Sequence, residues 1–88
     1  MGVARPRRRA AIAVRIADLS LRMNDFPLAA TLYERAAPTL SGDEGFVLKY
    51  AEARWRAGQT SAARAMLDKL IEKSPTNAAA VNLRRRIR

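Results

Sequence analysis

Apolar residues recur at three- and four-residue spacing through most of the chain, in stretches separated by short turn signals. In the first stretch Ile12, Ile16 and Leu19 fall at i, i+4 and i+7, with small residues beside them. This is the period of one face of an α-helix. We therefore expect a helix from about residue 10, with these residues on its apolar side, that ends at Asn24 and Asp25.

The next stretch predicts a second helix that begins near Phe26. Asp25 can accept hydrogen bonds from the free N–H groups of the first turn, and Pro27 fits only in that turn. Pro38 disfavours helical backbone at the residue before it and is expected to end or kink the helix. The residues predicted to form the buried face are Ala29, Leu32, Tyr33 and Ala36.

Three further helices are predicted by the same period. One runs from about Glu44 to a left-handed cap at Gly58, the next is capped by Thr60 or Ser61, and a short last helix begins at Ala78 after a cap at Thr76 or Asn77. Their apolar faces are predicted at Val47, Leu48, Ala51 and Trp55; at Ala63, Met66, Leu67, Leu70 and Ile71; and at Ala80, Leu83 and Ile87.

The turn signals repeat with a fixed period. Asn24-Asp25 and Gly58-Gln59 lie 34 residues apart, as do the closing signals at Ser41 and Pro75. A period of this length indicates stacked supersecondary units. Superposing the units pairs Ala13 with Val47, Ile16 with Tyr50, Ala17 with Ala51, Ala29 with Ala63, Tyr33 with Leu67 and Ala36 with Leu70.

This pattern resembles the tetratricopeptide repeat family over about Ala10 to Asn77. The first unit carries the motif at Ala13, Ile16-Ala17, Ser20, Ala29, Tyr33 and Ser41, and the second at Val47, Tyr50-Ala51, Arg54, Ala63, Leu67 and Pro75. Neither unit has the opening Trp, and Ser20 and Arg54 stand where the family prefers an aromatic residue. The resemblance implies an all-α fold, an α-solenoid of two antiparallel helical hairpins plus a short capping helix. The predicted division is a flexible basic tail at 1–9, repeats at 10–43 and 44–77, and an Arg-rich capping helix at 78–88.

The resemblance also implies a binding groove, because the first helix of each hairpin in such arrays lines a concave surface that holds a peptide or partner helix. The implied groove residues are Val14, Asp18, Leu21, Arg22, Leu48, Lys49, Glu52, Trp55 and Arg56. Trp55 is the strongest candidate contact, since Trp is enriched at binding hot spots. The alternative is that Trp55 packs against the short final helix. A carboxylate clamp, a known ligand mode of the family, is not expected, because only Lys49 among the corresponding positions would serve.

The formal net charge of +9 belongs to the two ends of the chain. The basic clusters comprise Arg7, Arg8 and Arg9 at one end and Arg84, Arg85 and Arg86 at the other. Such clusters can bind nucleic acid or an anionic membrane surface through phosphate neutralisation. They can equally be a solvated tail and a polar solenoid cap, which we favour because no aromatic residue interleaves either cluster.

Candidate catalytic chemistry is sparse. The chain has no Cys and no His, which removes thiol nucleophiles, imidazole catalysis and the usual zinc ligands. We expect no enzymatic activity, no cofactor and no metal. The apolar run from Ala10 to Ala17 is too short and too charged to span a bilayer, so cytoplasmic localisation is the default expectation.

The sequence therefore predicts a scaffold that binds another protein, with the basic ends as an alternative binding site. Repeat arrays usually need three or more units to bury a continuous core. A third hypothesis is therefore that the chain forms a homo-oligomer or belongs to a longer array.

Overall fold

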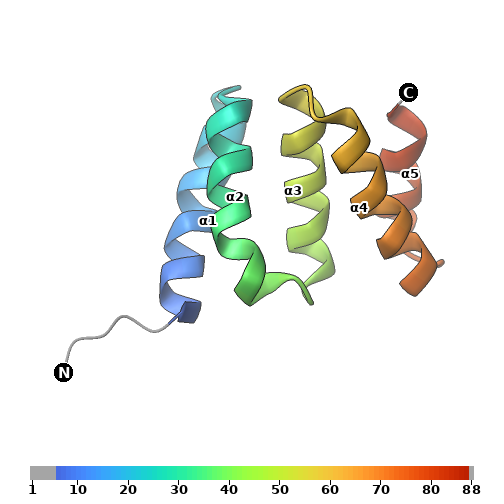
Figure 1. The fold of residues 1–88 in the computed structure, drawn as a ribbon, viewed down its shortest axis with the longest axis horizontal. Helices are drawn as coiled ribbons and strands as arrows, with labels where there is room; N and C mark the ends of the chain where they lie inside the picture. Colours follow the sequence, from blue (N-terminus) through green and yellow to red (C-terminus); the bar gives the residue numbers. More distant parts are fainter. Residues whose placement is uncertain (1–5, 88) are drawn as a thin grey trace.

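The computed structural model describes residues 6–87, which form five α-helices and no β-strand. These are α1 (Pro6–Arg22), α2 (Phe26–Leu40), α3 (Glu44–Arg56), α4 (Thr60–Lys73) and α5 (Ala78–Arg86). The helices stand side by side in chain order, and each hairpin packs against the next (Figure 1). The expected all-α solenoid of antiparallel hairpins is confirmed.

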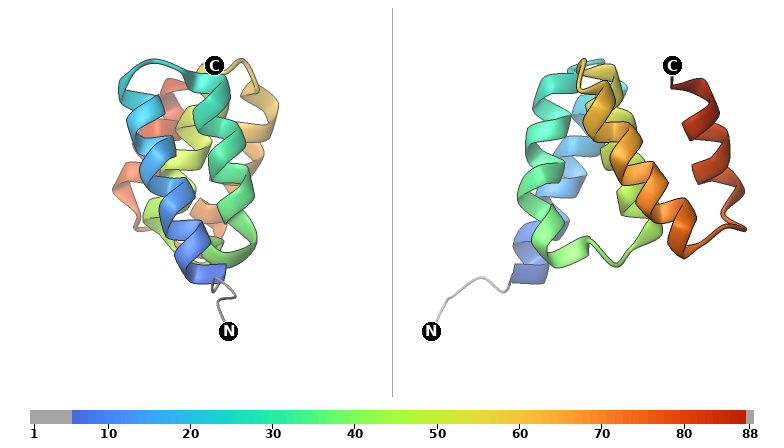
Figure 2. Two further views of the ribbon diagram at one scale, coloured as in Figure 1. Left: turned by 90° about the vertical axis from the view of Figure 1, so that its left-hand side faces the viewer. Right: turned by 45° about the vertical axis from the view of Figure 1, so that its right-hand side comes forward.

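The 34-residue period determines where the helices begin. The first residues of α2 and α4, Phe26 and Thr60, are one period apart, and so are Glu44 and Ala78, the first residues of α3 and α5. The predicted capping helix α5 is thus equivalent to α3, the first helix of a hairpin. Viewed from the α1–α2 end, α1, α3 and α5 lie on one side and α2 and α4 on the other (Figure 2).

Short polar side chains start three of these helices; the caps at Asp25 and Asn77 were predicted, and Asp43, expected in a turn, is a third. The Asp25 carboxylate accepts from the Leu28 N–H at 3.3 Å, Asp43 from Phe46 at 3.1 Å, and the Asn77 side-chain oxygen from Ala80 at 3.1 Å. The expected Thr60 or Ser61 cap is wrong. Helix α4 already begins at Thr60, so its capping position is Gln59, which makes no side-chain capping bond.

Two predicted boundaries need correction. The helix α1 begins at Pro6, so residues 6–9 are helical where a tail through Arg9 was expected. Pro is favourable in a first helical turn and Arg is a good helix former, so nothing there opposes the helix. Pro38 does not end α2, which continues to Leu40. The carbonyl that loses its hydrogen bond belongs to exposed Glu34, where water can replace it. Residues 1–5 of the predicted tail, and Arg88, lie outside the described residues.

Buried residues form two adjoining clusters, one around Tyr33 and one around Leu67. The Tyr33 ring is fully buried and packs edge-on against Phe46, with ring centroids 5.8 Å apart, and lies 6.4 Å from Tyr50. These three aromatic rings join α2 to α3. The first hairpin is therefore attached to the second through large side chains, whereas Ala residues dominate its own interior.

The large residues of the predicted apolar stripe of α1 face solvent, which contradicts the sequence-based expectation, whereas Ala17 and Ser20 of the same stripe are buried. Ile12, Ile16 and Leu19 are 53%, 47% and 49% exposed, while Ala10 and Ala17 are buried against α2. Small side chains allow the closest approach of two helices, so the Ala side of α1 forms the hairpin contact. The larger residues remain on the outer face of the solenoid end.

Candidate functional site

The face made by α1, α3 and α5 contains two neighbouring cavities that share Lys49. The first lies between α1 and α3, has a volume of about 500 Å³, and is lined by Arg15, Asp18, Leu21, Arg22 and Lys49. The second lies between α3 and α5, has a volume of about 220 Å³, and is lined by Leu48, Lys49, Glu52, Ala79, Asn82, Leu83 and Arg86. Six predicted groove residues therefore line this face: Asp18, Leu21, Arg22, Leu48, Lys49 and Glu52.

Asp18 links three helices in the wall of the first cavity. Its carboxylate accepts a hydrogen bond from the Tyr33 hydroxyl of α2, and its second oxygen lies 3.2 Å from the Lys49 ammonium of α3. Asp18 and Lys49 thus neutralise each other, and both side chains remain partly exposed. Since Lys49 is paired within the chain, it is not a free cation for a ligand carboxylate.

The environment of Tyr33 favours its neutral form. Burial raises the pKa of the Tyr33 hydroxyl well above its ordinary value, and the hydrogen bond to Asp18 and the charges of Asp18 and Glu52 raise it further. The hydroxyl therefore remains a donor to Asp18. This contact orients Asp18 at the edge of the cavity and anchors α1 to α2.

The other three predicted groove residues line neither cavity. Val14 packs against the core cluster around Tyr33. Trp55 is half-buried against the second core cluster, with the Arg86 guanidinium of α5 5.3 Å from its ring centroid. Arg56 pairs with Glu52 at 3.7 Å and lies over the Phe26 ring. Packing of Trp55 against the final helix, the alternative interpretation, is what these contacts favour.

Two polar clusters outside the face lie within the second unit, residues 44–77, and sequence analysis missed both. The Glu44 carboxylate at the start of α3 accepts from the Ser74 hydroxyl and, at 2.8 Å, from the Asn77 amide. These hydrogen bonds lower the pKa of Glu44.

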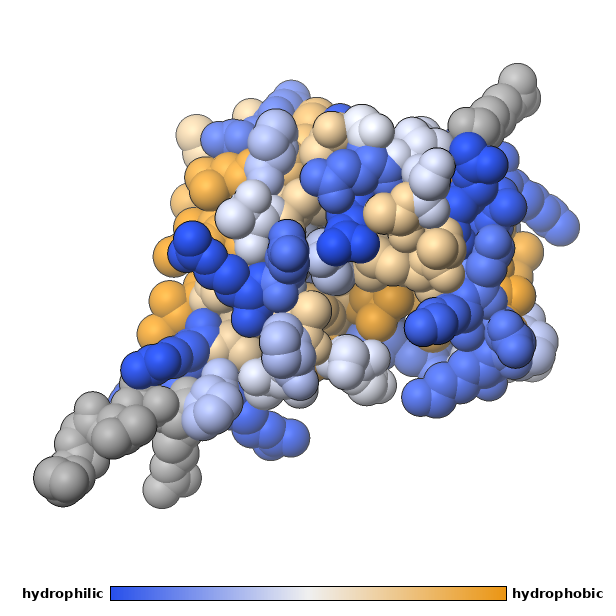
Figure 3. All heavy atoms as spheres, in the orientation of Figure 1, coloured by the Kyte–Doolittle hydropathy of each residue, from blue (hydrophilic) through white to orange (hydrophobic). Residues whose placement is uncertain are grey.

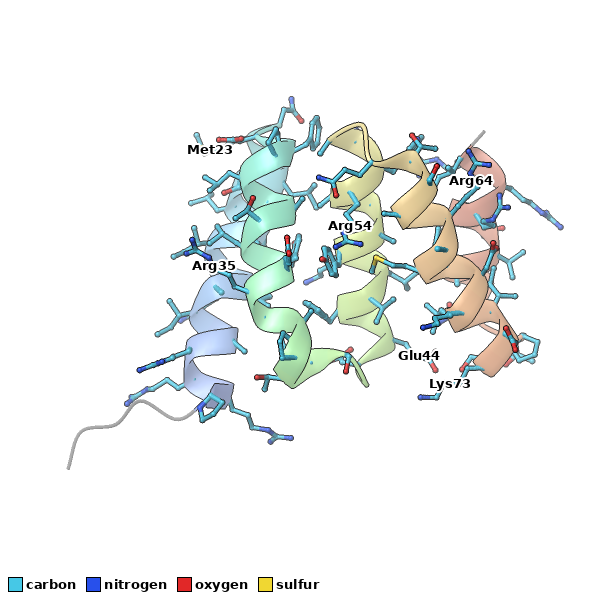
Figure 4. All side chains as sticks on the ribbon, in the orientation of Figure 1. Met23, Arg35, Glu44, Arg54, Arg64 and Lys73 are labelled. Carbon is cyan, nitrogen blue, oxygen red and sulfur yellow. The ribbon has the colours of Figure 1, made fainter. Side chains whose placement is uncertain are left out.

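Arg54 lies between α2 and α4 (Figure 4), with its guanidinium 4.3 Å from the Tyr50 ring centroid and near the Met66 sulfur. Arg54 thus covers the ring of the family's motif residue, a role that its sequence position did not suggest.

The basic clusters lie at opposite ends of the solenoid. Arg7, Arg8 and Arg9 are exposed in the first turn of α1. At the other end Arg84 pairs with Asp68 at 2.8 Å, and Arg86 lies over Trp55. The cationic residues at the two ends therefore do not form one continuous patch.

Within residues 6–87 no group of acidic side chains is arranged to hold a metal ion. No helix in the same part of the chain has the length and hydrophobicity needed to cross a membrane.

Comparison with known families supports the architecture. A family model described as tetratricopeptide repeat matches residues 20–87, which include α2 to α5 and the end of α1. Searches of curated proteins and of solved structures found no match.

Proposed function

Because the chain belongs to the tetratricopeptide repeat family, we propose that it binds a segment of a partner protein along the face formed by α1, α3 and α5. Repeat solenoids present extended concave surfaces of this kind and typically act as non-catalytic scaffolds. The observation that carries the proposal is the pair of adjoining cavities that share Lys49. Together the two cavities form a continuous binding surface across the equivalent helices α1, α3 and α5.

The chemistry of the face suggests the kind of segment it takes. Leu21, Leu48 and Leu83 supply apolar surface in the two cavities. The acidic lining residues, Asp18 and Glu52, are already paired with Lys49 and Arg56. The remaining charges of the lining are Arg15, Arg22 and Arg86. A complementary segment carries one or two apolar anchors with acidic side chains beside them.

The test compares capture of partner proteins by the wild type and by a groove variant, Leu48→Ala with Arg22→Ala. The matched control is Leu28→Ala with Arg85→Ala, because both side chains are exposed and line neither groove cavity. Proteins held by the wild type and the control should be lost from the groove variant, which circular dichroism must show to be helical. Equal capture by all three refutes the groove.

Trp55 is not a suitable first test of this proposal. Its ring packs against the cluster that joins α4 and α5, so Trp55→Ala is expected to reduce stability as well as any binding. A truncation of a buried aromatic side chain costs about 3–5 kcal/mol, and somewhat less for a half-buried one. Leu48 packs against the same cluster but is a smaller side chain than Trp55, and Arg22 is exposed, so their truncation is expected to reduce stability less.

A further inference from the structure

The outer face of α1 carries an apolar stripe that nothing in the described residues covers. Ile12, Ile16, Leu19 and Met23 recur at four-, three- and four-residue spacing, and each is about half exposed or more. Hydrophobic residues are visible along the edge of the molecule where α1 lies (Figure 3). A neighbouring groove of about 500 Å³ between α1 and α2 adds buried Leu32 to this surface.

The internal repeat shows what occupies the equivalent position in the second unit. One period after Ile12, Ile16 and Leu19 come Phe46, Tyr50 and Ala53. These are all buried against the preceding helix α2. The stripe on α1 therefore has the form of a surface that receives a helix. Its own sequence spacing, alternating four and three, is that of a seam between two packed helices.

The charges beside the stripe specify the occupant further. Arg8, Arg15 and Arg22 recur every seven residues along one edge of the stripe and are exposed. None of the ion pairs found within residues 6–87 involves them. On the other edge Arg9 and Arg35 line the groove, and Figure 4 shows Arg35 at the side of the molecule away from α3. The stripe thus has cationic residues on both sides.

We propose that this α1 face binds an amphipathic helix of a different protein, one that carries apolar residues at heptad spacing and acidic residues on both flanks. In helix pairs, charged residues beside the apolar seam select the partner. This site shares Arg15 and Arg22 with the lining of the α1–α3–α5 groove. Its apolar residues, Ile12, Ile16, Leu19 and Met23, line neither groove cavity. It gives the molecule a second docking surface, at the end of the solenoid.

A second copy of the chain does not satisfy the same chemistry. Antiparallel pairing of two α1 helices brings Arg15 of one copy beside Arg15 of the other. Parallel pairing brings the edge with Arg8, Arg15 and Arg22 of one copy against the edge with Arg9 and Arg35 of the other. Like charges in such positions oppose association, and the net charge of +9 adds a general repulsion.

The test uses the full chain and a labelled synthetic helix of about three heptads with Leu in the seam and Glu on both flanks. A second peptide has Lys in place of each Glu. Fluorescence anisotropy should show that the Glu peptide binds, more weakly as salt increases, and that the Lys peptide does not. Ile12→Ser with Ile16→Ser should weaken binding by at least about tenfold, because two half-exposed side chains no longer become buried.

A charge variant tests the cationic edges of the stripe without changing the groove lining. Arg8→Gln with Arg9→Gln, one residue from each edge and neither in the groove cavities, should weaken binding of the Glu peptide about three- to tenfold, whereas Arg7→Gln with Arg85→Gln, which removes the same charge elsewhere, should not. Equal binding of the two peptides, or unchanged binding by the Ile12/Ile16 variant, overturns the proposal.

Two other results also overturn the proposal. One is a wild-type dimer in sedimentation that the Ile12/Ile16 variant dissociates, since a second copy then covers the stripe. The other is loss of the Glu peptide in the Leu48→Ala variant with retention in the Ile12/Ile16 variant. That outcome assigns the peptide to the groove and leaves the proposed function standing.

Discussion

The contact between Tyr33 and Asp18 provides a direct test of how the first hairpin is held together. Tyr33 is fully buried at the centre of the aromatic cluster, and its hydroxyl donates to the Asp18 carboxylate. Tyr33→Phe removes the donor and keeps the ring. The change therefore probes one hydrogen bond without opening a cavity.

The size of the effect follows from the surroundings of the two partners. A hydrogen bond to a charged group contributes about 1.5–3 kcal/mol. Asp18 is 36% exposed and keeps its ion pair with Lys49, so water and Lys49 compensate for part of the loss. We expect Tyr33→Phe to lower the free energy of unfolding by about 1–2 kcal/mol, or about 4–16 °C in melting temperature for a domain of this size.

A double-mutant cycle separates this bond from other effects of each change. Asp18→Ala leaves the buried hydroxyl without its acceptor and is expected to cost about 1–3 kcal/mol. In the double variant the two losses should not add, with a coupling of at least about 1 kcal/mol between the sites. Urea denaturation followed by circular dichroism measures all four proteins.

The pH dependence gives a second measurement of the same contact. Burial, followed by the bond to Asp18, raises the pKa of Tyr33 in the folded chain. The unfolded chain loses this proton near pH 10 while the folded chain keeps it. Wild-type stability should therefore decline above about pH 10 more steeply than that of Tyr33→Phe. Additive losses in the cycle together with identical alkaline profiles would refute the assigned role of the hydroxyl.

Three further predictions concern other parts of the chain. Gly58→Ala should lower the free energy of unfolding by about 1–2 kcal/mol in urea denaturation, because an L-residue is strained at the φ of 91° found there. The added methyl group meets no neighbouring atom, so the cost comes from the backbone alone. Gly42→Ala, where the methyl group is also in open space, should cost little, and equal losses in the two variants would contradict this explanation. Glu44→Gln should reduce stability at pH 7 and have a smaller effect at pH 3, because a carboxyl with a lowered pKa contributes fully above its unfolded pKa and loses that contribution as pH falls; an equal loss at both pH values would refute it. Retention on immobilised RNA or DNA, if it occurs through the basic ends, should fall steeply with salt, and salt-independent retention would exclude this mode.

Local sequence signals were sufficient to predict most of the helix boundaries. Asp25, Asp43 and Asn77 each start a helix with a side-chain bond to the backbone, and Gly58 ends one through its positive φ. These effects involve residues within one helical turn, so sequence alone specifies them. The 34-residue period then predicts the stacking of hairpins, and paired positions such as Ala17 with Ala51 and Ala29 with Ala63 are buried in both units.

The candidate site was less predictable. The repeat register brought six expected residues to the α1–α3–α5 face, but it did not show that Asp18 is paired with Tyr33 and Lys49. Those partners lie 15 and 31 residues away in sequence. Likewise Arg86 covers Trp55 only because α5 turns back against α3 and α4. Contacts at such separations depend on how helices pack and not on any local pattern.

The sequence by itself determined the helices, the caps at Asp25 and Asn77 and the period of the repeat, because hydrogen bonding within a turn and the recurrence of apolar residues are properties of the local chain. Only the tertiary structure decided which side of α1 faces the hairpin. Both sides of that helix are apolar, one with Ala10 and Ala17 and the other with Ile12 and Ile16. Close packing against α2 selects the small side chains, and so leaves the large ones exposed at the end of the solenoid.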